Sequence, residues 1–216
     1  MEVTFTKLAG RRYQMAVVRE RGPELAPRGG PGYHDYLPHD AVHFLVEAEA
    51  GLAGGVFGRI AAGRTDFFWA ADPALLRRER RRVKARKPTA GEQADMARSE
   101  MLAGTCQVLW EARAGHLATL PEWFSRVEPE TLESDLVQRI MGRLDEFAAR
   151  WHALQAGGSI TLAWPLNDRA GREQRRSAAN ARRHGAAGRR PRGQRSPRGW
   201  TRTRSRSGFG WRCGPP

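Results

Sequence analysis

The sequence predicts an α+β domain: a small antiparallel sheet packed by about four helices, followed by a disordered Arg-rich carboxyl-terminal tail. Three observations carry this prediction. Apolar residues alternate at both ends of residues 1–166, they recur at helical spacing between those ends, and the composition changes abruptly after Leu166.

The strands are predicted from alternation. Apolar and polar residues alternate before and after a turn at Gly10 and Arg11, which indicates an amino-terminal hairpin within residues 1–22. The same alternation returns at residues 159–164, with Ile160, Leu162 and Trp164 on one side. Because an isolated hairpin is only marginally stable, we expect this late strand to join it in one sheet.

The segment between residues 22 and 38 is rich in glycine and proline and is expected to be an irregular loop. A helix is then expected to start at Pro38 and to stop at Gly51. A second, short helix is expected at residues 53–62, where several glycines would allow close approach to a neighbour. Residues 65–69 are a candidate short strand.

Two longer helices are expected at residues 91–117 and 129–155. In the second, apolar residues step by three and four positions, which is the seam of a helix packed on another helix. The seam residues are Val137, Ile140, Leu144, Phe147, Trp151 and Leu154.

Residues 167–216 differ in kind from residues 1–166. They contain fifteen arginines against Asp168 and Glu173, and therefore carry +13 of the chain's +14 net charge. With no Leu, Ile, Val or Met after Leu166, this segment is predicted to be disordered. Two interpretations stay open: a native tail, or an out-of-frame end read from GC-rich DNA. In either case we expect the segment to bind polyanions nonspecifically at low salt.

Compartment and membrane association follow from composition. The two cysteines, Cys106 and Cys213, make no disulfide framework, and Cys106 is expected in the core. The first residues lack the apolar run of a signal peptide, and nothing approaches the roughly twenty apolar residues that span a bilayer. We therefore expect a cytoplasmic protein without membrane partners.

The candidate site is the sequence LPHDAVHFLVEAE at residues 37–49. His39 and His43, four positions apart, have the spacing with which a helix offers two nitrogen ligands to one metal, and Glu47 could add an oxygen. A divalent metal is therefore a candidate cofactor. The alternative, which we favour at this stage, is structural: His43 is hydrogen-bonded in or near the core, with His39 and Glu47 at its rim.

The same segment is similar to the H-E-x-x-H helix of zinc metalloproteases but departs from it. That chemistry uses a glutamate between the histidines as general base, whereas Asp40 is one methylene shorter. No third-ligand motif follows, and Glu100 is expected on a solvated face. A protease of this kind is therefore disfavoured.

A basic segment at residues 77–87 is the second candidate site. Its eight basic residues surround one acidic residue, Glu79, which would suit nonspecific binding of nucleic-acid phosphates. Aromatic residues for base stacking are not interleaved in it. The candidate contacts within the segment are Arg77, Arg78, Arg80, Arg81, Arg82 and Lys84.

The order of hairpin, Gly/Pro loop, LPHDAVHFLVE helix, GLAGGVFGRIAAG and a helix carrying Met96–Glu100 resembles uncharacterised bacterial proteins of GC-rich genomes. The resemblance spans residues 1–165 and implies a fold unit of its own, without an activity. The sequence thus favours a binding or interaction domain. Metal binding or metal-dependent catalysis at His39, His43 and Glu47 is the first alternative, and nucleic-acid binding the second.

Overall fold

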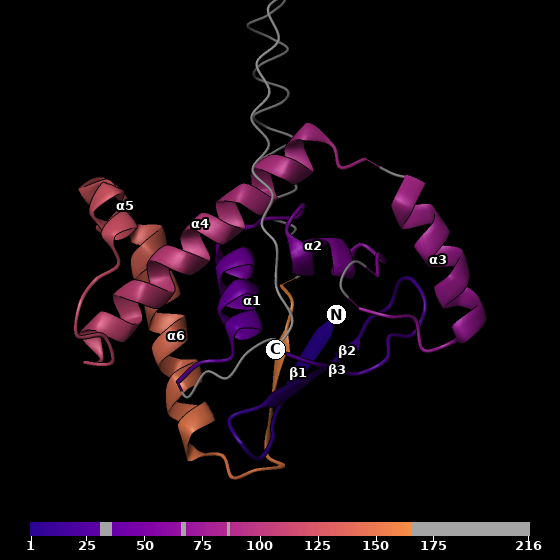
Figure 1. Ribbon diagram of the computed structural model, residues 1–216, viewed down its shortest axis with the longest axis horizontal. Helices are drawn as coiled ribbons and strands as arrows, with labels where there is room; N and C mark the ends of the chain where they lie inside the picture. The colour runs from indigo at the N-terminus through magenta and orange to yellow at the C-terminus, as the bar shows by residue number, and fades with distance from the viewer. Residues whose placement is uncertain (31–35, 66–67, 86, 166–216) are drawn as a thin grey trace, which may run out of the picture. The chain divides into compact units, whose positions relative to one another are not determined.

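The computed structural model describes residues 1–30, 36–65, 68–85 and 87–165 (Figure 1). The tail predicted to be disordered, residues 167–216, lies outside the described residues. The described residues belong to one compact unit, and they confirm the α+β class.

One antiparallel sheet has the order β3-β2-β1-β4. Strands β1 (Glu2–Lys7) and β2 (Tyr13–Val18) form the predicted hairpin, and β4 (Ser159–Ala163) pairs with the other edge of β1. Phe5 lies opposite Met15 on one side and Ile160 on the other. The two ends of the domain therefore pair in one sheet, as the alternation predicted.

The edge strand β3 (Arg28–Gly29) was not predicted. It pairs with Gln14 and Met15 of β2, inside the loop that we expected to be irregular. The expectation was wrong here because the Gly/Pro content of the loop is not uniform. Arg28 and Gly29 form a two-residue stretch without proline, which is enough to pair with the free edge of β2.

Helices cover the sheet in two layers (Figure 1). Helices α1 (His39–Ala50) and α6 (Asp135–Ala153) lie against it, since the ring of Phe5 meets Phe44 of α1 and Phe147 of α6 edge to face. Helix α4 (Ala90–Arg113) packs on α1 and α6, and α2 (Val56–Ala61) packs on α1. Helix α1 is thus enclosed by the sheet and by helices, which is why it is buried over residues 41–47.

Several predicted boundaries move for identifiable reasons. Gly51 ends α1 in a left-handed conformation, as expected, whereas Pro38 is the residue before the helix and not its first residue. The expected helix at 129–155 is divided into α5 (Pro129–Leu132) and α6, because the Ser134 hydroxyl accepts the Val137 N–H and starts a new helix. The described residues form six α-helices and one short 3-10 helix (Glu122–Arg126), more than the four expected.

Helix α3 (Pro73–Ala85) contains most of the basic segment. It lies apart from α1, α4 and α6 in Figure 1 and packs extensively on no described element. The candidate strand at 65–69 was not found as such: residues 66 and 67 lie outside the described part, and Ala70 forms an isolated bridge with Leu25 instead.

The seam of α6 is part of the buried core of the domain. Leu144 is fully buried, so Leu144→Ala should lower the free energy of unfolding by about 2–5 kcal/mol through lost burial and a residual cavity. Met101→Ala is the matched control on α4, because Met101 is 50% exposed and its loss should cost less than about 0.5 kcal/mol. Urea unfolding measures both, and equal losses would contradict this assignment of the core.

Candidate functional site

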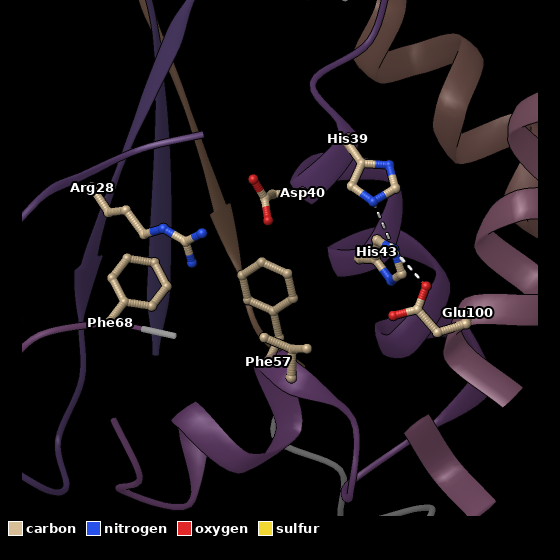
Figure 2. Close-up of a pocket in the computed structure, with 8 residues that line it drawn as sticks. Arg28, His39, Asp40, His43, Phe57, Phe68 and Glu100 are labelled. Carbon is tan, nitrogen blue, oxygen red and sulfur yellow. Dashed lines mark hydrogen bonds and ion pairs between the residues drawn. The ribbon is translucent and has the colours of Figure 1, made fainter. Parts of the chain in front are cut away.

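A pocket opens beside the amino-terminal half of α1 (Figure 2). Polar side chains from three elements line it together with an apolar wall. Arg28 of β3 lies on one side and Glu100 of α4 on the other, with the two histidines of α1 next to Glu100 (Figure 2). The lining residues are Arg28, His39, Asp40, His43, Val56, Phe57, Phe68 and Glu100.

Glu47 is fully buried, and its carboxylate is directed at the start of α2. One oxygen accepts the Val56 N–H at 2.9 Å, and the other accepts those of Phe57 at 2.8 Å and Gly58 at 3.4 Å. A β-carbon on Gly55 would lie 2.4 Å from the Glu47 carboxyl carbon, so only glycine allows this approach. The predicted rim position of Glu47 is therefore wrong, whereas the predicted close approach of the glycine-rich helix is confirmed.

The protonation of Glu47 is governed by two opposed effects. The pKa of Glu47 is raised, because burial outweighs the hydrogen bonds from the Ser99 hydroxyl and the three N–H groups, which act in the opposite direction. All four neighbours are donors directed at the carboxyl oxygens, so the arrangement fits the ionised form, which only accepts.

Ser99 connects Glu47 to His43. The Ser99 hydroxyl donates to Glu47 Oε1 at 2.8 Å, and the same oxygen lies 3.0 Å from His43 Nδ1. Since the single hydroxyl proton is used by Glu47, the Ser99 oxygen can only accept from His43. Neutral His43 therefore carries its proton on Nδ1, and its Nε2 presents a lone pair towards the pocket.

His39 is fixed in the same way by α4. Its Nδ1 lies 3.4 Å from Gln107 Oε1, while the Gln107 amide nitrogen donates to Glu111 at 2.9 Å. The bond to Glu111 orients the amide so that its oxygen faces His39. His39 then donates from Nδ1, and its Nε2 also presents a lone pair.

The two Nε2 atoms lie 3.2 Å apart on rings that meet edge to face, and Glu100 Oε2 lies 3.8 Å from that of His43. His43 is buried and His39 is exposed, as the structural alternative predicted. Burial, and then the neighbouring His39, lower the pKa of His43. Glu100 was expected to face solvent only; its side chain is 64% exposed, but its carboxylate reaches the histidine pair.

Asp40 is held by the sheet. The Tyr13 hydroxyl donates to Asp40 Oδ2 at 2.5 Å, and burial followed by the charge of Asp40 raises the pKa of Tyr13. Asp40, which stands where zinc metalloproteases have the glutamate, is thus already hydrogen-bonded to Tyr13. This agrees with the expectation that a protease of this kind is disfavoured.

The basic segment at residues 77–87 does not line this pocket. Arg77, Arg78 and Arg81 are exposed on α3. The side chains of the other three candidate contacts, Arg80, Arg82 and Lys84, lie outside the described part.

Sequence reasoning missed the α4 half of the site. The pattern did not predict that Ser99 and Gln107 contact the two histidines or that Glu100 lies beside His43. The spacing of Ser99 and Gln107, eight residues or about two helical turns, was the available signal that they share a face.

Comparisons add no further assignment: no protein-family model, curated protein or solved structure matches the chain. In the described part of the chain, no three or more His, Cys, Asp or Glu side chains stand together as a ready metal-ligand set. No helix there is long and apolar enough to cross a bilayer.

The Glu47 contacts give the second prediction. Glu47→Ala should lower the free energy of unfolding by about 3 kcal/mol or more, because it leaves several buried donors without an acceptor, at about 1–3 kcal/mol for each. Glu49→Ala, on the same helix, removes partly exposed ion pairs to Arg139 and Arg143 at 3.6–3.7 Å and should cost less than about 1 kcal/mol. Chemical unfolding compares the two, and a Glu49 loss as large as the Glu47 loss would refute the role given to Glu47.

Proposed function

We propose that this domain binds a divalent transition-metal ion in the pocket, with His39 Nε2 and His43 Nε2 as ligands and Glu100 as the third. The observation that carries the proposal is the pair of Nε2 atoms 3.2 Å apart, each on a ring whose other nitrogen already donates a hydrogen bond.

Two ring nitrogens without a proton repel each other at 3.2 Å unless something positive lies close to both. Each ring has its N–H directed away from the pair, at Ser99 or Gln107, so neither neutral ring can donate to the other. A cation bound to both nitrogens removes this conflict. A shared proton would do the same, and the titration below separates the two.

The distances support a metal. Two nitrogen ligands about 2.0–2.1 Å from one ion stand about 3.0–3.4 Å apart, and the observed separation lies within this interval. Metal-binding histidines usually donate their second N–H to an oxygen that fixes the ring, as Ser99 and Gln107 oxygens do here. Two imidazole ligands favour zinc, iron, nickel or copper over calcium and magnesium, which prefer sites made of oxygen ligands alone.

Glu100 replaces Glu47 as the proposed oxygen ligand. Glu47 is enclosed by four donors and has no oxygen to offer the pocket, whereas Glu100 is exposed and lies 3.8 Å from His43 Nε2. A side-chain rotation of Glu100 would complete a set of two histidines and one carboxylate.

The domain would then be a binding module whose pocket requires a metal. Positions on the ion not taken by protein would face the apolar wall of Val56, Phe57 and Phe68. We also propose a reducing cytoplasm as its compartment, since Cys106 is free, buried and unreactive, with its pKa raised by burial to about 12.

The test is a metal titration of the full chain, purified without a His-tag. Calorimetry with Zn²⁺, Co²⁺ and Ni²⁺ should show one tight site, and Co²⁺ should give a visible spectrum of mixed nitrogen and oxygen ligation. His39→Gln should weaken binding by at least about tenfold, because losing a direct ligand should cost no less than losing a residue that only orients one.

His152→Gln is the matched control, because His152 is also exposed on a helix but its Nε2 contacts the Tyr36 carbonyl, away from the pocket. It should bind metal as the wild type does. If the wild type takes up no ion, or if the two variants bind equally well, metal binding at this pocket is refuted.

A further inference from the structure

Helix α3 carries a concentration of positive charge that the pocket does not use. Residues 77–87 have a net charge of +7, while the rest of residues 1–166 has a net charge of −6. The net positive charge of residues 1–166 therefore comes from one short segment, most of which belongs to α3.

Helix α3 makes few packing contacts with the rest of the described domain. The Asp72 side chain accepts the Ala74 N–H at 2.7 Å and starts the helix, but α3 packs extensively on no described helix or strand. Leu75 is 38% exposed, and Arg77, Arg78 and Arg81 are exposed as well. The described side chains thus give α3 one cap and no buried face.

The charges of α3 oppose its own folding. Arg77 and Arg81 are four positions apart, and Arg78 and Arg81 are three apart, so like charges adjoin on the helix surface. An isolated helix of this length is marginal in water even without such repulsion. A polyanion alongside α3 would turn these repulsions into attractions.

We propose that α3 binds the phosphate backbone of a nucleic acid. Its six basic residues between positions 77 and 84 cover about 12 Å of helix, or about one positive charge per 2 Å. Duplex DNA presents one negative charge per about 1.7 Å of its axis, a similar density. The match concerns charge alone, so binding is independent of base sequence.

Other anionic partners fit α3 less well. Insertion into the surface of a bilayer requires a broad apolar face, and the large apolar residues of α3 are only Leu75, Leu76 and Val83. An acidic peptide rarely sustains a charge every 2 Å along a line. This inference is independent of the metal proposal, because α3 and the pocket share no residue.

The test compares two triple variants of the full chain with equal loss of charge. One is Arg77→Gln, Arg78→Gln and Arg81→Gln on α3, and its matched control is Arg202→Gln, Arg204→Gln and Arg206→Gln in residues 167–216. Fluorescence anisotropy with a 20-bp duplex and with single-stranded RNA, between 50 and 200 mM salt, gives the salt dependence of affinity. For duplex DNA, the α3 variant should reduce the slope of log K against log salt by up to about 2.7.

Hydrogen exchange with the same probes assigns the effect to α3. Amides of residues 76–85 should exchange more slowly with duplex or RNA bound in the wild type and in the control variant, and not in the α3 variant. Unchanged exchange of α3 on binding, or an unaltered slope in the α3 variant, would overturn the proposal and assign binding to residues 167–216. Protection by vesicles containing phosphatidylserine, with none from nucleic acid, would overturn it in favour of a membrane.

Discussion

The carboxylate of Glu47 is the interaction on which the candidate site depends. It accepts N–H groups at the start of α2 and the hydroxyl of Ser99 from α4, so three helices meet at one buried side chain. Its bond to Ser99 also decides which nitrogen of His43 carries the proton. Glu47 therefore fixes both the position of α2 and the orientation of His43, although its own side chain does not line the pocket.

Packing alone does not explain a charged residue at this position. Removing a carboxylate from water costs several kcal/mol, and replacing buried polar groups with well-packed apolar ones is often neutral or stabilising. A leucine at position 47 could fill the space, but it could neither satisfy the N–H groups of Val56 and Phe57 nor take the Ser99 proton. The orientation of His43 is what a glutamate provides and an apolar residue does not.

The limits of prediction from sequence follow from which contacts are local. Alternation and helical spacing are local properties, and they predicted the hairpin, the closing strand and the α6 seam. Spacing also placed His39, His43 and Glu47 on one slowly turning stripe of α1. It could not show that Glu47 is buried against α2 and α4 while the histidines line the pocket, because that depends on how helices distant in sequence pack. Glu100, 57 residues after His43, was for the same reason expected to face only solvent.

Burial separates the two carboxylates near the histidines into different roles. A metal ligand needs an accessible side chain and an oxygen with a free lone pair. Glu47 offers neither, because it is fully buried and its oxygens accept hydrogen bonds from four donors. Glu100 is mostly exposed and close to His43, so it can turn towards an ion without breaking the core. Because Ser99 precedes Glu100 directly, α4 contributes both the residue that fixes His43 and the carboxylate beside it. A shift of α4 would therefore disturb both the orientation of the histidine and the third ligand, which makes the packing of α4 on α1 a requirement of the proposed site.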